Sequence, residues 1–368
     1  MNVRGDAPVE RLEARVLTVP TDGPEADGTL RWDSTTMILV EAVAAGVTGL
    51  GWTYGAGASA AVVHELLREP VLGRSALDVP GAHEAMGRAV RNAGRPGLVV
   101  GALSAVDIAL WDLKARLLGL PLVSLLGRAR REVPVYGSGG FTTYGGRRLE
   151  EELGDWREQG IPRVKIKIAE SRGDCEDRDL ARVEQTRLAI GEDAELYVDA
   201  NGGYSRKQAV RVGRVLAGLG VTWFEEPVSS DDLAGLAVVR DAVTADVAAG
   251  EYGYDLPYFA RMVGVVDCLQ ADATRCGGIT GWLRAAALAE AHCLQLSGHC
   301  APHVHAHAAA AVPNLRHLEW FHDHVRVEEL LFEGTLSPRG GALRPGADGA
   351  PGLGLTLRAD SAAAYRTG

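Results

Sequence analysis

Long hydrophobic runs, runs of basic residues and paired cysteines are all missing from this 368-residue chain. Its longest apolar stretches are broken by Gly, Arg or Asp well before the length of a membrane span, so we expect no membrane partner. The formal net charge is -10 at pH 7, and without a basic stripe a nucleic-acid surface is disfavoured. The segment MNVRGDAPVERLEARV has charges of both signs and no apolar core, which argues against a secretory signal and predicts a cytoplasmic location.

The cysteines also form no recognisable framework. The five are Cys175, Cys268, Cys276, Cys293 and Cys300, with no CxxC pair among them. Such a set predicts neither disulfide bonds nor a zinc ribbon, so we interpret most of them as small buried apolar residues. We therefore expect the partners of this chain to be small molecules.

Residues 1–127 predict an α+β unit. Strands are expected at 12–19 and 35–43, separated by a loop over 21–28 that is rich in Gly, Pro and Asp. A helical pattern follows from about 59 to 125, and its clearest helix begins at Ser104 and ends at Gly119. The tail 334–368 is rich in Gly and Pro, and its PGLGLTL segment is a candidate strand returning to this first unit.

Residues 128–333 predict a second unit in which short apolar strands alternate with helices. The eight strand candidates are VPVYGSGG, RVKIKIA, ELYVDAN, TWFEEP, DVAAGE, CLQADA, QLSGHC and HLEWF. This alternation fits a parallel barrel and also an open, doubly wound sheet. Chemically competent residues follow strand after strand, and because barrel enzymes build their sites at the C-terminal strand ends, this pattern favours a (β/α) barrel.

Three acidic residues stand out at successive strand ends: Asp199 in YVDAN, Glu225 in WFEEP and Glu251 in AAGEY. A single acid in such a place is usually a solvated loop residue. Here the separations, 225 minus 199 and 251 minus 225, are both 26 residues, which places the carboxylates on neighbouring strands facing one space. Converging carboxylates need a cation, and an all-oxygen set suits Mg²⁺ or Mn²⁺.

Two further motifs supply candidate bases. Lys165 and Lys167 alternate with isoleucines in KIKI, so both ammonium groups face one side of a strand, either into a barrel or, on an edge strand, into water. Two adjacent lysines lower each other's pKa, which makes a neutral amine a competent base. Asp272 and His299 end two neighbouring strands, and an Asp that fixes the imidazole tautomer raises the basicity of the other ring nitrogen.

Glu319, in HLEW, lies in the last strand candidate. Held protonated, it would donate a hydrogen bond to a substrate carboxylate. The alternative is an ordinary charged residue at the barrel end.

The ordered set KxK, VDAN, FEEP, GE, DxxxxGG and SxH resembles the mandelate racemase group of the enolase superfamily over nearly the whole chain. The segment SAVDIALWDLKARLLGLPLVSLLG is similar to the helix that joins that family's capping domain to its barrel. The resemblance implies a modified TIM barrel, (β/α)7β, with an α+β capping domain. It also implies a homo-oligomer.

The resemblance assigns a role to each candidate. It implies that Mg²⁺, with Mn²⁺ as the alternative, is held by Asp199, Glu225 and Glu251. It further implies that Lys167 is the base on one face of the substrate. His299 paired with Asp272, the His299 dyad, would be the base on the other face. Lys165 would neutralise the substrate carboxylate, and Glu319 would be the hydrogen-bonding acid.

These roles predict abstraction of the α-proton of a carboxylate through an enediolate. The first hypothesis is dehydration of an acid sugar to a 2-keto-3-deoxy acid, chosen because such substrates are common in similar family members. The second is racemisation or epimerisation by the same two bases. An inactive binding barrel is the third, and the complete set of motifs argues against it.

Other signals are weaker. Trp52 and Tyr54, in GWTYG, either cover the substrate, as capping loops of the family do, or pack in the core. His303, His305 and His307 alternate in HVHAHA, but no Cys or acid nearby completes a zinc set, so we expect a surface or helix-capping role for them. The loops expected over 18–28 and 49–57 should set specificity, although they contain no decodable signal.

Overall fold

The computed structural model describes residues 7–367. Its first part is an antiparallel meander of three strands, β1 (Arg11–Ala26), β2 (Arg31–Ala44) and β3 (Val47–Tyr54). Both predicted strands are present and longer than expected. The predicted loop over 21–28 is wrong for most of its length, because after an irregularity β1 resumes pairing with β2 at Glu25 and Ala26.

The third strand of this meander was missed because its glycines suggested a loop. Gly49 and Gly51 lie in β3 opposite Ala42 and Val40 of β2. A Cβ on Gly51 would lie 2.2 Å from the carbonyl oxygen of Ala105 in the helix above. The glycines therefore let a helix pack directly on the backbone of the strand.

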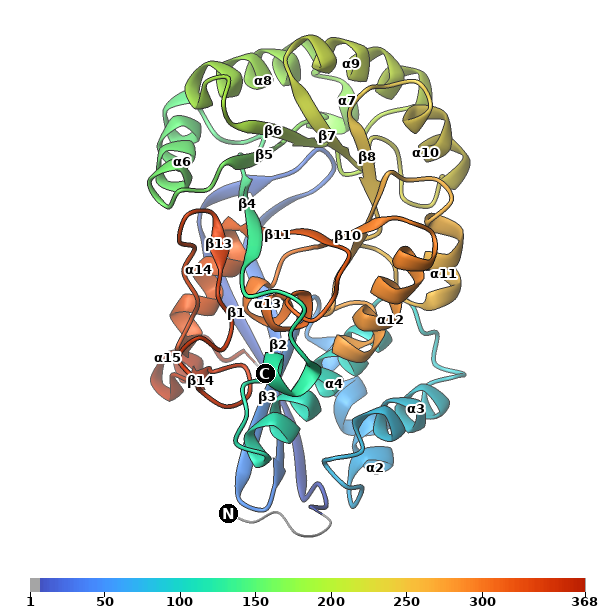
Figure 1. Ribbon diagram of the computed structural model, residues 1–368, viewed down its shortest axis with the longest axis vertical. Coiled ribbons are helices and arrows are strands. Elements are labelled where there is room, and N and C mark those ends of the chain that lie inside the picture. Colours follow the sequence, from blue (N-terminus) through green and yellow to red (C-terminus); the bar gives the residue numbers. More distant parts are fainter. Residues whose placement is uncertain (1–6, 368) are drawn as a thin grey trace.

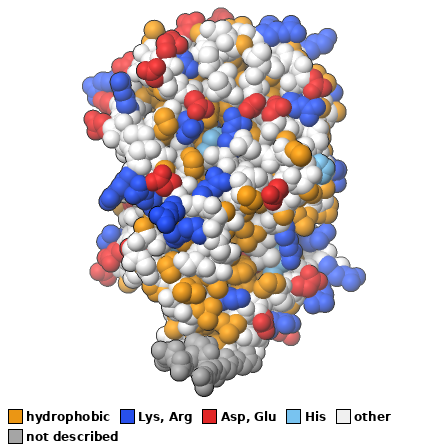
Figure 2. Space-filling view, in the orientation of Figure 1, with side chains coloured by type: hydrophobic (Ala, Val, Ile, Leu, Met, Phe, Trp, Pro, Cys, Tyr) orange, Lys and Arg blue, Asp and Glu red, His pale blue; other side chains and the backbone are white. Residues whose placement is uncertain are grey.

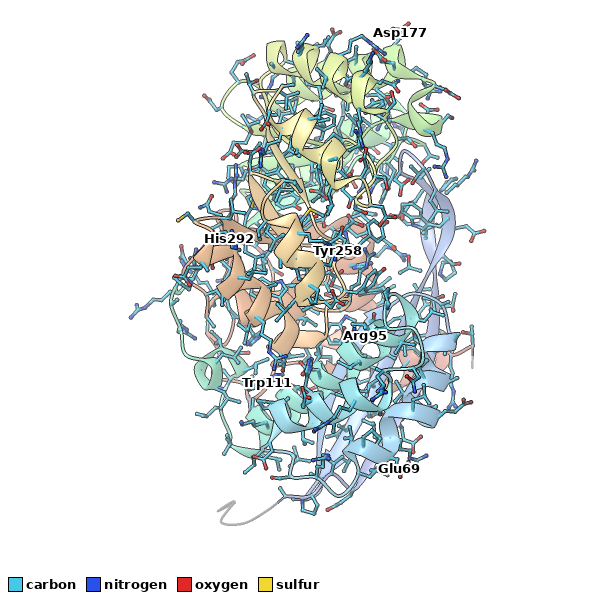
Figure 3. All side chains as sticks on the ribbon, turned by 90° about the vertical axis from the view of Figure 1, so that its right-hand side faces the viewer. Glu69, Arg95, Trp111, Asp177, Tyr258 and His292 are labelled. Carbon is cyan, nitrogen blue, oxygen red and sulfur yellow. The ribbon has the colours of Figure 1, made fainter. Side chains whose placement is uncertain are left out.

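That helix is α4, the longest of the helices that follow the meander. These helices are α1 (Ala58–Val62), the π-helical turn η1 (Val63–Leu67), α2 (Arg68–Val71), α3 (Val79–Ala89), α4 (Leu98–Leu117) and α5 (Leu122–Leu126). The predicted helix at Ser104 is α4, which begins six residues earlier. It is buried on nearly every side because it lies between the meander and the barrel. Trp111 of α4, labelled in Figure 3 at this junction, donates a hydrogen bond to Thr280 of the barrel.

All eight predicted barrel strands are confirmed: β4 (Val133–Gly139), β5 (Arg163–Lys167), β6 (Glu195–Asp199), β7 (Val221–Glu225), β8 (Asp246–Ala249), β9 (Cys268–Ala271), β10 (Gln295–Gly298) and β11 (Leu315–Phe321). They run parallel in chain order, and β11 pairs with β4. This pairing closes the sheet into the predicted barrel and excludes the open sheet (Figure 1).

Helices surround the barrel between successive strands: α6 (Gly146–Glu158), α7 (Glu170–Gly173), α8 (Glu176–Ile190), α9 (Arg206–Gly218), α10 (Leu233–Arg240), α11 (Leu256–Met262), α12 (Gly278–Ala291), α13 (Pro302–Ala309) and α14 (His322–Leu331). Val164 and Ile166 of β5 belong to the large apolar core, whereas the alternate side chains point into the barrel. Tyr136, Tyr197 and Trp223 pack together in the interior at the middle of their strands. The C-terminal strand ends are left for polar groups.

The tail forms β12 (Phe332–Glu333), β13 (Ala342–Leu343), β14 (Thr356–Leu357) and α15 (Ala359–Ala364). The PGLGLTL strand, β14, pairs with β12 and not with the meander. The PGLGLTL segment nevertheless reaches the first unit, where Gly352 accepts the backbone N–H of Leu122 and donates its own to Leu120. Further along the tail, Thr18 donates its N–H to the carbonyl of Tyr365. The boundary at 127 and 128 remains a prediction.

Within residues 7–367, no helix has the length and apolar character needed to cross a membrane. Basic and acidic side chains both occur over the barrel on the face shown in Figure 2.

Substituting Gly51→Ala tests the close approach of β3 and α4. The added methyl group would collide with helix backbone atoms that cannot rotate away, so we expect a loss of about 1–3 kcal/mol in the free energy of unfolding. Gly87→Ala in α3 is the control, because a Cβ there meets nothing within 4 Å, and it should be neutral or stabilising. Chemical denaturation of both variants measures this, and equal stabilities would contradict the packing argument.

Candidate active site

The three predicted acids meet at one end of the barrel. Asp199 and Glu225 are the last residues of β6 and β7 and lie in register with each other, and Glu251 follows β8. All three side chains are buried, and one oxygen from each lies within 4.8 Å of the others. The parallel ladder therefore produces the convergence that the 26-residue spacing predicted.

This cluster fits a hard divalent cation. It offers only carboxylate oxygens, and Glu251 Oε2 is buried without a hydrogen-bond partner. Burial raises the pKa of Glu225 to about 7 despite the opposing effect of Lys165. A buried acceptor without a donor and a carboxylate that resists ionisation both indicate a place where positive charge is needed.

Both lysines point into this cluster. Lys167 Nζ lies 2.5 Å from Asp199 Oδ2, and Lys165 Nζ lies 2.5 Å from Glu225 Oε1. Burial lowers the pKa of Lys167, but Asp199 outweighs it and leaves that pKa raised. The pKa of Lys165 is likewise raised, because Glu225 and Glu319 overcome the effect of burial. Lys165 does lower the pKa of Lys167, as expected, but the nearer carboxylate of Asp199 outweighs it. The neutral amine expected from the lysine pair is therefore not favoured in this arrangement.

His299 and Asp272 lie in contact, as predicted. The Nδ1 atom of His299 lies 2.8 Å from Asp272 Oδ2, and its Nε2 atom lies 3.3 Å from Glu251 Oε2. Burial lowers the pKa of His299, whereas the nearby carboxylates of Glu251, Glu319 and Asp272 raise it, and the net direction is upward. The dyad thus directs Nε2 toward the acidic cluster.

Glu319 lies beneath the others. Its Oε1 atom accepts the hydroxyl of Ser138 at 2.6 Å and contacts Lys165 Nζ at 2.9 Å. Burial raises its pKa, but Lys165 and His299 lower it further, so the pKa of Glu319 lies well below its usual range. The protonated state expected from the sequence therefore gives way to an ionised carboxylate in this arrangement.

A cavity of about 370 Å³ opens above these groups. Lys167, Glu251 and His299 line its floor, and residues of the meander, including Thr35 and Tyr54, line its other wall. The meander therefore caps the barrel mouth and encloses a space in which both candidate bases are accessible.

Two family models match the chain. The first, described as the mandelate racemase/muconate lactonizing enzyme N-terminal domain, covers residues 14–127, and the second, described as enolase C-terminal domain-like, covers residues 148–361. The chain belongs to the mandelate racemase/muconate lactonizing enzyme family. The resemblance inferred from the motifs is confirmed.

The chain is also similar to individual named proteins and solved structures. The chain is 34% identical to L-talarate/galactarate dehydratase of Salmonella typhimurium over 85% of its length and 78% of the relative's. A solved mandelate racemase/muconate lactonizing enzyme-like protein from Rubrobacter xylanophilus has a TM-score of 0.95 and 55% identity, over 98% of this chain and all of that one. A racemase from Streptomyces coelicolor, solved with bound magnesium, has a TM-score of 0.91 and 30% identity, over 98% of this chain and 100% of that one.

Trp52 and Tyr54, which were predicted either to cover the substrate or to pack in the core, have different surroundings. Tyr54 lines the cavity, where its ring stacks on His324 with centroids 3.5 Å apart. Trp52 is fully buried and stacks on Phe332. The structure therefore supports the packing alternative for Trp52 and a place at the cavity for Tyr54.

The surface or capping role expected for His303, His305 and His307 is wrong, because all three are buried. His303 Nδ1 contacts Glu328 Oε2, His305 Nε2 accepts the backbone N–H of Ala273 at 2.8 Å, and His307 Nδ1 accepts a backbone N–H at 3.2 Å. Sequence periodicity could not show this burial, because α13 is enclosed on all sides. None belongs to a potential metal-ligand group among the described residues.

Arg275 was not predicted from the sequence, although it lies inside the DxxxxGG motif that begins at Asp272. Its Nη1 atom lies 3.0 Å from Glu251 Oε1, and its Nε atom lies 3.5 Å from Asp272 Oδ2. The guanidinium thus connects the acidic cluster with the His299 dyad. The only signal for Arg275 in the sequence was its position three residues after Asp272.

Strained backbone also marks the strand ends. Asn201, Glu226 and Cys300 have positive φ values of 44°, 37° and 49°. Each follows a predicted site residue by one or two positions, where the chain turns sharply into a loop. Such conformations are costly and concentrate at functional sites.

Glu328 in α14 joins the cap to the barrel and offers a test of that connection. Its Oε1 atom accepts hydrogen bonds from Trp52 Nε1 at 3.0 Å and from the hydroxyl of Tyr54 at 2.9 Å. Glu328→Leu leaves these buried donors without an acceptor, so we expect a loss of at least about 2 kcal/mol in the free energy of unfolding.

Glu328→Gln is the matched control, because its amide oxygen still accepts from Trp52 and Tyr54. Its amide N–H can donate to His303 Nδ1 when the imidazole proton is on Nε2, which lies 3.3 Å from the carbonyl of Leu336. Thermal and denaturant unfolding of both variants checks the prediction. Equal loss in the two variants would show that hydrogen bonding does not hold the cap here.

Proposed function

We propose that this protein removes the α-proton of a carboxylate substrate in a Mg²⁺-dependent reaction and that the overall reaction is dehydration of an acid sugar to a 2-keto-3-deoxy acid. The observation that carries the proposal is the placement of Lys167 and the His299 dyad on different sides of the three-carboxylate cluster. They come from β5 and β10, which are not neighbours in the ring, and both line one cavity.

The chemistry requires positive charge prepared in advance. A proton α to a carboxylate is too weakly acidic for a side-chain base unless the dianion left behind is stabilised. Bound to Asp199, Glu225 and Glu251, Mg²⁺, or Mn²⁺ in its place, would supply that charge as a Lewis acid. Lys165, held beneath the cavity by Glu225 and Glu319, adds a second fixed positive charge.

Lys167 is the proposed base on one side. An ion held by Asp199 would offset the charge of the carboxylate beside Lys167, so the pKa of Lys167 would fall. Asp272 keeps the proton of His299 on Nδ1, so Nε2 is free to take or return a proton on the other side.

Dehydration uses these groups in sequence. One base removes the α-proton, the C–O bond at the β-carbon breaks, and His299 as general acid gives a proton to the departing hydroxyl, which leaves as water. The enol that remains becomes the 2-keto acid after protonation at carbon. The cavity wall next to the cap is polar, since Thr35 and Asp323 line it and are hydrogen-bonded to each other. Such a wall suits a polyhydroxylated substrate, and the similar dehydratase acts on talarate and galactarate, as its name states.

Racemisation or epimerisation is the second candidate, because two bases on different sides of one carbon are what inversion needs. The structural likeness to a racemase supports it. A small-molecule carboxylate is the expected partner in both cases. Symmetric self-association and a cytoplasmic location remain predictions.

The two reactions are distinguished by screening sugar acids with the Mg²⁺-loaded enzyme in D₂O. We expect at least one acid to give a 2-keto product, measured by semicarbazide absorbance and by NMR. Deuterium exchange with inversion and no keto product would replace dehydration with epimerisation. Neither exchange nor product across the library would favour the inactive barrel.

Lys167→Ala tests the base. We expect turnover to fall by about 10²–10⁴-fold, as when a general base is lost, while Mg²⁺ binding by calorimetry persists, because no carboxylate is removed. Glu225→Gln is the contrasting variant and should weaken Mg²⁺ binding. Unchanged turnover of Lys167→Ala would show that the base is assigned to the wrong residue.

A further inference from the structure

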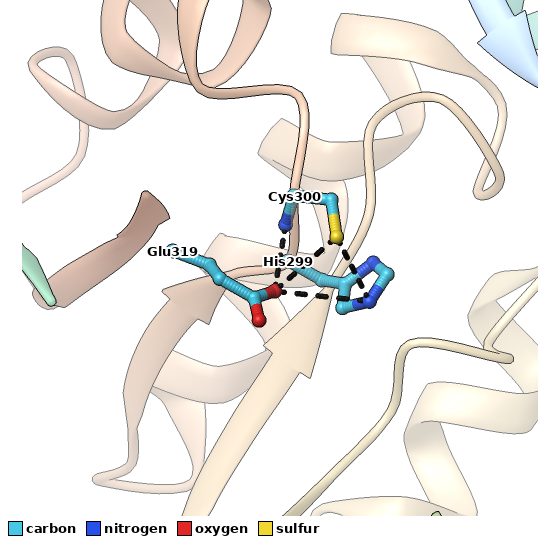
Figure 4. A group of neighbouring side chains, drawn as sticks. All are labelled: His299, Cys300 and Glu319. Carbon is cyan, nitrogen blue, oxygen red and sulfur yellow. Dashed lines mark hydrogen bonds and ion pairs between the residues drawn. The ribbon is translucent and has the colours of Figure 1, made fainter. Parts of the chain in front are cut away.

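A second group of potential ligands adjoins the acidic cluster, and it contains sulfur. His299 Nε2 lies 3.3 Å from Cys300 Sγ, Cys300 Sγ lies 3.4 Å from Glu319 Oε2, and His299 Nε2 lies 3.7 Å from that same oxygen. Figure 4 shows the three side chains close together, and they come from the turn after β10 (His299 and Cys300) and from β11 (Glu319). All three are buried.

These separations match those of ligands around one tetrahedral ion. Zinc binds Cys sulfur at about 2.3 Å, His nitrogen at about 2.05 Å and carboxylate oxygen at about 2.1 Å. With tetrahedral angles, such ligand atoms lie about 3.4–3.6 Å from one another. Each observed separation is within a few tenths of an ångström of this range, so the triangle needs little rearrangement to hold an ion.

We propose that His299, Cys300 and Glu319 form an inhibitory site for a thiophilic divalent cation such as Zn²⁺. Binding replaces the thiol proton of Cys300, which is released to solvent, with a sulfur–metal bond. Nitrogen, sulfur and oxygen donors suit Zn²⁺, whereas Mg²⁺ prefers the all-oxygen cluster next to it. Donor chemistry therefore sorts the two ions between neighbouring sites.

The surroundings leave the three donor atoms usable. Lys165 contacts the other oxygen of Glu319, Oε1, at 2.9 Å. Oε2 accepts the backbone N–H of Cys300 at 2.9 Å, which fixes the loop and keeps a lone pair of this oxygen available. His299 and Cys300 both line the cavity, so an ion can reach them from the space that substrate would fill.

Inhibition follows from the shared imidazole, and this step rests on the proposed function. His299 Nε2 is the atom assigned to proton transfer. With its lone pair bound to a metal ion, it cannot accept a proton. The enzyme should lose activity at low Zn²⁺ even with Mg²⁺ in excess, and a chelator that removes Zn²⁺ should restore it.

Co²⁺ added to the full-length protein in excess Mg²⁺ tests the site without substrate. We expect one equivalent to bind with thiolate-to-cobalt charge-transfer absorption in the near ultraviolet, and Zn²⁺ to abolish that absorption. Cys300→Ser should lose the band and bind Zn²⁺ at least about 10-fold more weakly. Cys293→Ser, which alters an exposed free thiol, is the control and should keep both properties.

The proposal is overturned if the band persists in Cys300→Ser, if it is lost in Cys293→Ser, or if excess Mg²⁺ prevents Zn²⁺ binding altogether, which would place Zn²⁺ on the three carboxylates. Zinc inhibition of any acid-sugar turnover is measured separately. A cobalt band without turnover of any sugar acid would refute the proposed function and leave the cation site intact.

Discussion

Buried carboxylates crowd one end of the barrel, and offsetting their mutual repulsion is the condition on which the rest of the site depends. Among them are Asp199, Glu225, Glu251, Asp272 and Glu319. In a weakly polarisable interior such charges repel strongly unless cations lie among them. Lys165, Lys167 and Arg275 supply this compensation at distances of 2.5 to 3.5 Å. A protein that maintains so concentrated an arrangement is organised to handle negative charge that appears during a reaction.

The barrel fixes this arrangement through its backbone. Lys167, Asp199 and Glu225 stand side by side in the parallel ladder of β5, β6 and β7, so backbone hydrogen bonds hold their separation. Tyr136, Tyr197 and Trp223 pack against one another in the interior at the middle of the strands. The polar groups are thus held on rigid strands, whereas the cap supplies one wall of the cavity.

Much of this could be predicted from sequence because the strand ends carry conspicuous residues. The eight apolar strands, the 26-residue spacing and the KIKI alternation each reflect local periodicity. What escaped prediction depends on contacts between distant segments. β3 contains glycines that suggested a loop, and their purpose is visible only when α4 lies on them. The burial of His303 and His305 follows from enclosure of α13, and the protonation states of Lys167 and Glu319 follow from which opposite charge lies nearest in space.

The contact between the tail and β1 has a consequence for how the molecule is made. β1 is the outer strand of the meander, and its free edge at Val16 and Thr18 is covered by Thr367 and Tyr365. Thr18 and Thr367 are separated by 349 residues, so during synthesis this edge stays uncovered until all the strands of the barrel have been made. An uncovered strand edge invites pairing with other chains, and the cap of the growing chain is therefore open to such pairing until the tail is complete.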